Sequence, residues 1–384
     1  SRASVRALYG ERLRLSASRI DKFASCRFAY FMQYALKARP HEPAGFTAPE
    51  LGTFVHRILE QVTREAVSMG GYKSIGDETV RALCDKYVSE YIRRELNDFR
   101  DKSKRFEYLF RRLISSVHQI ALDLADELRR SDFEPLSFEL DFAHTPELPP
   151  LELGDGEDKL VLTGIADRVD GWLHEGKLYL RIVDYKTGRK NFELSDVLYG
   201  MNLQMLLYLF SLGENGHELY GHEIVPAGVL YVPARDEVTK SDFDLSDEEL
   251  KKKRGASLRR SGLILNDPEV IAAMEHSDTP RYIPVTFKKS GADGDALVSA
   301  ERLGVLARHI DKTLSEMASE LRSGSIAADP YYAGQQETAC TNCDYFDACR
   351  FRDGENGESM RITPHLKATK VWNVLEGGKI DGEI

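Results

Sequence analysis

The amino-acid sequence predicts an α/β domain in which a central mixed sheet is flanked by helices. Alternating apolar and polar residues indicate strands at 136–142, 158–172 and 176–186. Amphipathic helical patterns precede and follow these strands. With 384 residues and 42% hydrophobic content, the chain is long enough to form one large domain, or two ordinary ones, around a real core.

Charge and cysteine content limit the class of protein. The net charge of −10 argues against a surface coated in positive potential, but a phosphate-binding footprint can be local. The basic runs Lys104–Arg112 and Lys251–Arg260 could form such a footprint or be ordinary solvated surfaces. Five cysteines, no signal peptide and no run of about 18 apolar residues predict a cytoplasmic protein without membrane contact.

The N-terminal third is predicted to be helical. Residues 1–12 read as a lead-in, and because the chain starts without methionine we expect it to be part of a longer protein. A first helix is expected over 16–36, with Ser18 and Asp21 as its capping pair. A second amphipathic helix starts at Leu51, and a large helical insertion is expected over about 64–132.

The strands and helices that follow define the rest of the predicted domain. The strands at 158–172 and 176–186 should form a hairpin through the turn "LHEG". The remaining expectations, in chain order, are a helix at 195–213, a buried strand at 224–233, a polar insertion at about 235–280, a strand at 283–287, a long helix at 296–324 and a tail over 353–384.

The strands carry an acid pair and a lysine, which are their best candidates for metal binding or catalysis. Side chains alternate faces along a strand, so Asp184 and Lys186 should emerge side by side, with Asp170 facing away from Asp167. If the hairpin places Asp167 near Asp184, two like charges at about 4 Å cost roughly 4 kcal/mol at an effective dielectric near 20. A divalent cation such as Mg²⁺ would reverse that cost. The alternative is an ordinary surface hairpin with a salt bridge.

Other polar residues lie near this acid pair in the predicted fold. His56 lies beside the apolar stripe of the second helix, and Glu139 lies on the first strand. Gln204 and Tyr208 are four residues apart and therefore share one helix face. Taken singly, a lone histidine on a helix is usually structural, and Gln204 and Tyr208 are most often packing residues.

Three cysteines at spacing C-x2-C-x5-C form the second chemical feature. Cys340, Cys343 and Cys349 supply three soft ligands, whereas a closed zinc site or an iron–sulfur cluster takes four. The spacing alone does not decide between the two kinds of site.

Together, the ordered motifs resemble the RecB-like branch of the PD-(D/E)XK nuclease superfamily. His56 lies in G-x-x-x-H, Asp167 in G-x-x-D, and Asp184 and Lys186 in D-Y-K. The resemblance implies that Asp167 and Asp184 bind Mg²⁺ or Mn²⁺, with His56 and the carbonyl of Tyr185 as further ligands. It also implies that Lys186 is the catalytic lysine.

Three further residues match this family more loosely. Glu139 fits the acidic position that the fold sometimes carries on its first core strand. Gln204 and Tyr208 match its Q-x-x-x-Y motif. The resemblance implies that these two residues help to position the substrate strand.

The cysteines narrow the resemblance to the iron–sulfur nucleases, which include the nuclease domain of AddB and the Cas4 exonucleases. By this resemblance the fourth ligand is Cys26, and a [4Fe-4S] cluster held by it and the C-terminal triplet clamps the two ends of the domain. The chain-entropy argument for cross-links gives roughly 5 kcal/mol for so long a loop. Zinc is the alternative occupant, and Cys84 is expected to be a free buried thiol.

The implied function is that of a metal-dependent DNA exonuclease domain covering residues 13–352. Its expected substrate is single-stranded DNA from a double-strand break, and its expected partner is an AddA-like helicase–nuclease subunit. The sequence has no phosphate loop G-x-x-x-x-G-K-[ST], so ATP-driven unwinding must come from elsewhere. The alternatives are a Cas4-like exonuclease that trims CRISPR spacer DNA and a non-catalytic DNA-binding module.

Overall fold

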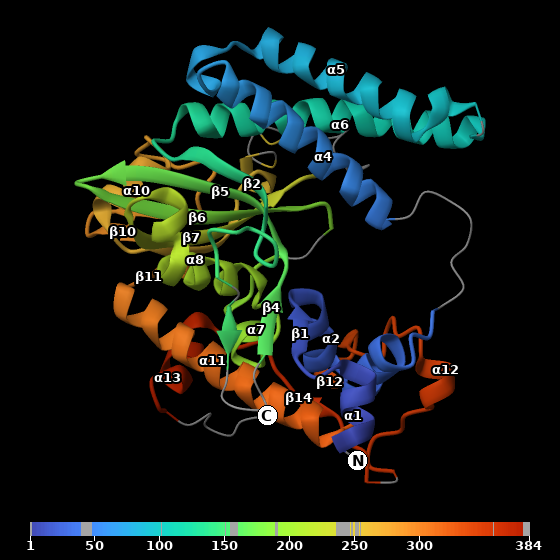
Figure 1. The fold of residues 1–384 in the computed structure, drawn as a ribbon. Coiled ribbons are helices and arrows are strands. Elements are labelled where there is room, and N and C mark those ends of the chain that lie inside the picture. The colour runs from blue at the N-terminus through green and yellow to red at the C-terminus, as the bar shows by residue number, and fades with distance from the viewer. Residues whose placement is uncertain are drawn as a thin grey trace.

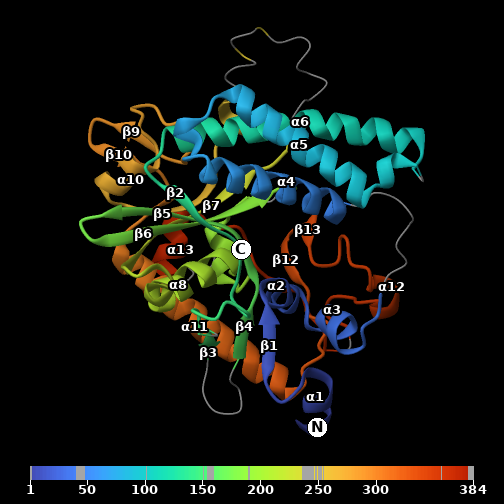
Figure 2. The same cartoon turned by 45° about the horizontal axis from the view of Figure 1, so that its top comes forward.

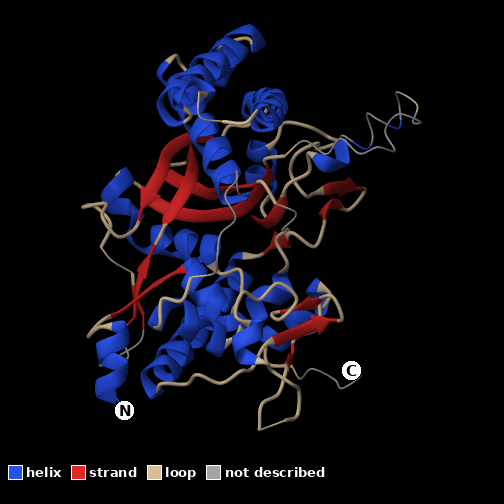
Figure 3. Ribbon diagram, turned by 90° about the vertical axis from the view of Figure 1, so that its right-hand side faces the viewer, coloured by secondary structure: helices blue, strands red, loops and turns tan. Residues whose placement is uncertain are grey.

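A six-stranded mixed sheet lies between two layers of helices (Figures 1 and 3). The structure is a computed structural model, and it confirms the predicted α/β class. It describes residues 2–39, 48–100, 102–149, 151–153, 160–188, 191–235, 246, 249, 253, 255–355 and 357–378.

The strand order of the sheet is β11-β8-β7-β6-β5-β2. The parallel pairs are β6 with β7 and β8 with β11, and the other neighbours are antiparallel. The strands are β2 (Glu134–Asp141), β5 (Ile165–His174), β6 (Lys177–Lys186), β7 (Glu223–Pro233), β8 (Ser261–Leu265) and β11 (Leu297–Val298).

The predicted hairpin of β5 and β6 is confirmed. Its turn residues Glu175 and Gly176 both have positive φ angles, 48° and 80°, as a two-residue turn between twisted strands requires. The last pair in register before the two strands part is Arg168 opposite Val183. Asp167 and Asp184 therefore lie just beyond the paired part of the hairpin.

One face of the sheet is covered by α4 (Ala48–Ser68), α5 (Asp77–Glu95) and α6 (Lys104–Arg129), as Figure 2 shows. The predicted helical insertion is therefore helical in the structure. The core of the layer formed by α4, α5 and α6 contains Phe54, Ile58 and Phe110, and it also includes Val183 and Tyr185 from β6. Short 3₁₀ turns connect these helices at Tyr72–Ser74 and Asn97–Phe99.

The opposite face is covered by α7 (Leu194–Leu198), α8 (Gln204–Tyr220) and α11 (Ala300–Ser323). The prediction of one helix over 195–213 was wrong. Gly200 and Asn202 have φ angles of 77° and 61°, and this left-handed backbone separates α7 from α8. The long C-terminal helix was predicted correctly.

The single strand expected over 158–172 is divided at Gly164. Residues before it form β4 (Leu160–Thr163), which pairs with β1 (Leu13–Ser16) and β3 (Glu152–Leu153) in a separate small sheet. A Cβ atom at Gly164 would collide with the hydroxyl of Tyr208, so the chain can change sheets here only with glycine.

The first predicted helix is interrupted at Cys26. The structure has α2 (Ala17–Ser25), α3 (Arg27–Tyr30) and a π-helical turn (Phe31–Ala35), with Cys26 extended between the first two. The predicted capping pair was also wrong, because the Ser16 hydroxyl accepts the bond from the Arg19 amide that caps α2.

The polar segment at 235–280 contains ordered elements that its composition concealed. It includes β8, which belongs to the main sheet, and α10 (Pro268–Met274). The predicted strand at 283–287 was wrong as a sheet strand. Instead β9 (Thr286–Lys288) pairs with β10 (Gly291–Asp293) alone. The basic run 251–260 lies partly outside the described residues.

The first and last helices of the described residues both pack on the domain. The helix α1 (Arg2–Tyr9) contacts α11, and α13 (Ala368–Leu375) contacts α7 and α11. Trp372 on α13 is 3% exposed, with the Arg302 guanidinium over its ring, so the predicted polar tail contributes to the core. The other C-terminal elements are β12 (Tyr331–Gly334), β13 (Glu337–Thr338), α12 (Phe346–Cys349) and β14 (Arg361–Ile362).

No helix in the described part of the chain combines the length and apolar character needed to cross a lipid bilayer.

Candidate metal centre and active site

Three predicted site residues from three elements meet at the edge of the sheet beneath α4. Ligand atoms of His56 on α4, Glu139 on β2 and Asp167 on β5 all lie within 4.8 Å of one another. Among the described residues this is the only such group of three or more histidine, cysteine, aspartate or glutamate side chains. Convergence of an imidazole with two carboxylates is typical of a divalent-metal site.

The backbone of Tyr185 holds two of these side chains in place. The Tyr185 amide donates a hydrogen bond of 2.8 Å to Oδ2 of Asp167. The Tyr185 carbonyl lies 2.7 Å from Nε2 of His56, which donates to it. The other ring nitrogen of His56, Nδ1, lies 3.3 Å from the same Asp167 oxygen. Asp167 and His56 therefore contact each other, and both are hydrogen-bonded to the backbone of Tyr185 on β6.

Asp184 and Lys186 form the adjacent part of the site. The Lys186 ammonium lies 2.7 Å from Oδ2 of Asp184 and 4.6 Å from the centre of the Tyr231 ring. Asp184 is only 6% exposed, and its charge interacts with those of Asp167 and His56. Asp184 does not belong to the group of His56, Glu139 and Asp167 whose ligand atoms lie within 4.8 Å of one another, but it lies beside that group.

The backbone of Glu139 is unusual. Its φ of 47° lies in the left-handed region in the middle of β2, a conformation that typically costs 1–3 kcal/mol for a residue other than glycine. Its neighbours Phe138 and Leu140 pair with Arg168 and Ala166, so Glu139 lies opposite Asp167. The strained backbone at Glu139 therefore coincides with the meeting point of the acidic side chains.

The electrostatics of the group favour a bound cation. Burial, followed by the charge of Asp167, raises the pKa of Asp184 to about 6. Burial, with Asp167 and Glu60, raises the pKa of Glu139 to about 7, although its side chain keeps contact with solvent. Burial lowers the pKa of His56, but the carboxylates of Asp167 and Asp184 outweigh it and the net pKa is raised. A divalent cation relieves such repulsion between carboxylates, so the donor set fits Mg²⁺ or Mn²⁺.

Gln204 and Tyr208 lie on α8 behind the site. Tyr208 is 1% exposed, and its hydroxyl interacts with Gln204 and the Ile165 backbone. The same hydroxyl occupies the space that a side chain at Gly164 would need. The G-x-x-D and Q-x-x-x-Y motifs are thus in contact, and Tyr208 touches the segment leading to Asp167.

A buried ion network, which the sequence analysis missed, lies under the site between the sheet and α6. Arg168 forms a bidentate pair with Asp170, at 2.7 and 3.0 Å, and Arg181 donates to the same carboxylate at 2.9 Å. Arg260 pairs with Glu127 of α6 at 2.5 Å. All five side chains are buried, and three arginines face two carboxylates. The alternation Arg168-x-Asp170 on a strand was the available signal.

The network reaches the site through Tyr185. Nη1 of Arg168 donates a hydrogen bond of 2.5 Å to the Tyr185 hydroxyl. The same tyrosine holds Asp167 and His56 through its backbone amide and carbonyl. Arg168 is therefore a positioning residue that restrains Tyr185 from the buried side of the sheet.

Four cysteines line one common pocket, here called the cysteine pocket, on the far side of the molecule from α5. They are Cys26, Cys340, Cys343 and Cys349. Burial, followed by the proximity of the other three thiols, raises the pKa of Cys340 to about 11. Cys84 lies elsewhere, fully buried on α5. The structure therefore brings the four predicted ligands together and leaves Cys84 apart.

The two neighbouring aspartates of β5 should respond differently to substitution. Asp170→Asn removes the buried carboxylate that pairs with both Arg168 and Arg181 and leaves only Glu127 facing three buried arginines, so we expect the free energy of unfolding to fall by about 3–5 kcal/mol. Asp167→Asn removes one of several crowded carboxylates, so we expect near-normal stability with weakened Mn²⁺ binding. Urea unfolding and calorimetric titration measure the two effects. Equal stability losses in both variants would contradict these assignments.

The affinity for Mn²⁺ should rise with pH. A carboxylate attracts the cation only when it is deprotonated, and the metal-free pKa values are about 6 for Asp184, an expected ligand, and about 7 for the neighbouring Glu139. Below its pKa, protonation of Asp184 adds about a tenfold loss of affinity per pH unit, and protonation of Glu139 below pH 7 weakens the attraction further. Calorimetric titration between pH 5 and 8 should show the gain levelling off above pH 7. Glu139→Gln should remove the part of the rise nearest pH 7, and a pH-independent affinity would refute the assignment.

Comparison with known proteins agrees with this geometry. Residues 14–350 match the PD-(D/E)XK nuclease superfamily. The chain is also similar to proteins named as the B-type subunit of an ATP-dependent helicase/deoxyribonuclease. It is 33% identical to that of Thermoanaerobacter sp. (strain X514) over 99% of this chain and 34% of the relative.

Two further relatives carry the same name. The protein of Caldanaerobacter subterraneus subsp. tengcongensis is 34% identical over 98% of this chain and 33% of its own length. That of Clostridium botulinum (strain Hall) is 34% identical over 97% of this chain and 33% of its own length. The chain therefore spans about a third of the length of these relatives.

The predicted fold family and the predicted similarity to AddB-type helicase–nuclease proteins are both confirmed, and the chain belongs to the PD-(D/E)XK nuclease superfamily.

Proposed function

We propose that this chain is a metal-dependent DNA exonuclease domain acting within a helicase–nuclease that processes double-strand breaks. The observation that carries the proposal is the convergence of His56, Glu139 and Asp167 beside the Asp184–Lys186 pair. The name of the relatives supports the helicase–nuclease context. The substrate proposed is single-stranded DNA, and the partner is an AddA-like subunit that supplies unwinding.

The proposed metal ligands are Asp167, Asp184, His56 and the Tyr185 carbonyl. When bound there, Mg²⁺ or Mn²⁺ would polarise the scissile phosphate and lower the pKa of the attacking water. The Tyr185 amide keeps the Asp167 carboxylate oriented through their hydrogen bond. The His56 ring is held by Asp167 and the Tyr185 carbonyl, so neither ligand has to be ordered on binding.

Lys186 is the proposed catalytic lysine. Its ammonium is held between Asp184 and the face of Tyr231, which fixes a positive charge next to the acids. That charge can orient the attacking water or neutralise the charge that develops on the phosphate. Glu139 has a pKa of about 7 and can exchange a proton near neutral pH.

Gln204 and Tyr208 are given separate roles. Gln204 is half-buried at the first turn of α8 and is the proposed contact to the substrate strand. Tyr208 is buried against Gly164, so we assign it to positioning the segment that carries Asp167.

We also propose that the cysteine pocket holds a [4Fe-4S] cluster. The four cysteines line one pocket, and burial, followed by the nearby thiols of Cys26, Cys343 and Cys349, raises the pKa of Cys340. Four thiolates can hold either a [4Fe-4S] cluster or one zinc ion, and the resemblance to iron–sulfur nucleases favours the cluster.

The nuclease assignment predicts that Asp184→Ala loses activity. We expect Mg²⁺-dependent degradation of labelled single-stranded DNA to fall by roughly 10²-fold or more, because both a ligand and the partner of Lys186 are lost. Asp293→Ala, an exposed carboxylate on β10, is the matched control and should keep full activity. Unchanged degradation by Asp184→Ala would rule out this site. DNA binding without degradation by the parent chain would favour the binding-module alternative.

The cluster assignment predicts a brown protein after anaerobic purification. Iron and acid-labile sulfide should be present in about equal amounts, with visible absorbance that Cys343→Ser abolishes and Cys84→Ala leaves unchanged. Cys84 is the matched control because it is buried on α5, away from the cysteine pocket. A colourless protein with one zinc ion per chain would reject the cluster.

A further inference from the structure

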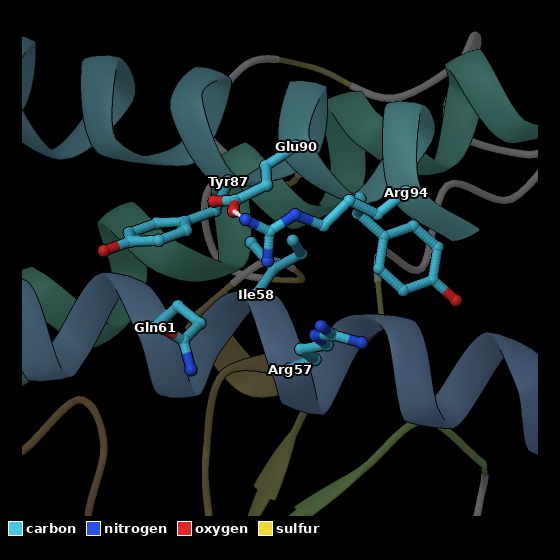
Figure 4. A pocket seen from close by; sticks show the side chains of 7 residues that line it. Arg57, Ile58, Gln61, Tyr87, Glu90 and Arg94 are labelled. Atoms are coloured by element: carbon cyan, nitrogen blue, oxygen red, sulfur yellow. Dashed lines mark ion pairs between the residues drawn. The ribbon is translucent and has the colours of Figure 1, made fainter. Parts of the chain in front are cut away.

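A groove between α4 and α5 lies outside the site described above. It encloses about 220 Å³, and Figure 4 shows its lining from both helices. The lining residues are Arg57, Ile58 and Gln61 of α4, and Tyr87, Glu90, Tyr91 and Arg94 of α5. The groove therefore combines two guanidinium groups and an amide with two phenol rings. Guanidinium and amide groups bind phosphates, and aromatic rings stack on bases.

The groove and the candidate metal centre flank the exposed side of α4, the groove against α5 and the metal centre against the sheet. The buried stripe of α4, which includes Phe54, Ile58 and Leu59, faces the core and leaves one side of the helix open. His56 lies at one edge of that open side, facing Tyr185. Arg57, the next residue, lies at the other edge and lines the groove. One helix diameter, about 10 Å, therefore separates the groove from the metal centre.

The two arginines of the groove are held by weak, exchangeable partners. Arg57 pairs with Glu95 at 2.8 Å, and Arg94 pairs with Glu90 at 2.7 Å. The side chains of both pairs are between about a third and two thirds exposed, and ion pairs in such positions are worth little. A phosphate group can therefore replace either glutamate at small cost.

Aromatic rings complete the groove. The Arg57 guanidinium lies 5.8 Å from the centre of the Tyr91 ring. Tyr91 is itself fixed against Phe54 and Phe110, at 4.8 and 6.4 Å between ring centres. A ring held in this way is a rigid platform that loses little entropy on stacking with a base.

The helical insertion continues the same chemistry beyond the groove. Residues 93–112 contain eight basic and four acidic residues, in a chain whose net charge is −10. At the start of α6, Tyr108 and Leu109 are 63% and 52% exposed between Arg105 and Arg112. Across the described residues no carboxylate forms an ion pair with either of these arginines, and the nearby Glu107 pairs with Lys104 and Arg111 instead. Local positive charge of this kind is the electrostatic footprint of nucleic-acid binding.

We propose that the α4–α5 groove is a nucleotide subsite that grips the single-stranded DNA substrate one helix width from the cleavage centre. Arg57 and Arg94 exchange their glutamates for phosphate oxygens, and the tyrosines stack on a base. The inference rests on the proposed nuclease function, since it names how that substrate is held. It assigns to the helical insertion the role of guiding the strand to the metal centre.

Paired variants of opposite effect test the groove. Arg57→Gln with Arg94→Gln should weaken binding of a fluorescein-labelled oligothymidine at least about tenfold by anisotropy, measured with EDTA so that cleavage plays no part. The plot of log K against log[salt] should lose about 1.4 in slope, or 0.7 for each phosphate contact. Glu90→Gln with Glu95→Gln should instead strengthen binding, because it frees both arginines.

A matched control removes two positive charges elsewhere. Lys177→Gln with Lys312→Gln breaks two exposed ion pairs far from the groove in sequence, to Glu223 on β7 and Glu316 on α11, and should leave the slope unchanged. Thermal unfolding midpoints should agree among all variants.

An unchanged affinity and slope in the arginine variant would overturn the subsite, as would equal effects in the control pair. A parent chain that binds the oligonucleotide but fails to cleave it with Mg²⁺ would refute the proposed nuclease function, and the groove would still be judged by the binding data.

Discussion

The hydrogen bond between the Tyr185 amide and the Asp167 carboxylate joins β5 and β6 at the point where their backbone pairing ends. In a regular sheet a backbone carbonyl would accept from this amide. Here the carboxylate takes that place, so Asp167 is held as firmly as a ladder residue although its strand has left the register. The His56 ring is likewise held by the Asp167 carboxylate and the Tyr185 carbonyl. The spacing of the acids is therefore a property of the sheet, and it exists before any ion binds.

This rigidity concentrates negative charge, and the sheet carries an opposite charge directly below it. Three buried arginines face only two buried carboxylates in the network around Asp170 and Glu127. Arg168 extends that positive charge to the Tyr185 hydroxyl, so one tyrosine connects the network to the acids. Buried ion pairs rarely add stability compared with apolar packing, but they fix geometry because each loss of a partner is costly. A metal site depends on the spacing of its acidic side chains, so it benefits from a buried network that fixes the position of Tyr185.

Strand periodicity was enough to predict the hairpin and the faces of its residues. It correctly separated Asp170 from Asp167, because alternation is a local property of extended backbone. It failed where one residue with a special conformation changed the path of the chain. Gly164 divides one predicted strand between two sheets, and the left-handed Asn202 divides one predicted helix. Both features are set by contacts distant in sequence, such as that of Gly164 with Tyr208, which no local pattern contains.

The sequence also did not predict that parts of the polar segments would be buried. The segment around β8 is rich in charge, yet β8 itself is an inner strand because β7 and β11 cover its two edges. Trp372 is buried because α11 provides a surface for α13, and composition alone gave the tail a polar character. Glu139 was placed on the correct strand, whereas its left-handed backbone, which coincides with the acid cluster, could only be seen in the structure.

The cysteine pocket and Lys186 are connected by a short chain of contacts through Asp21, Asn202 and Tyr231. Asp21, five residues before Cys26 on α2, accepts a hydrogen bond of 2.8 Å from the Asn202 amide. The side chain of Asn202 accepts from the Tyr231 hydroxyl at 3.0 Å, and the Tyr231 ring lies under the Lys186 ammonium. Asn202 and Tyr231 are both buried, so neither can relax toward solvent when a neighbour moves. Loosening α2 would therefore release Asn202 and then the ring that holds Lys186, which makes the integrity of the cysteine pocket a condition for the geometry of the candidate site around Lys186.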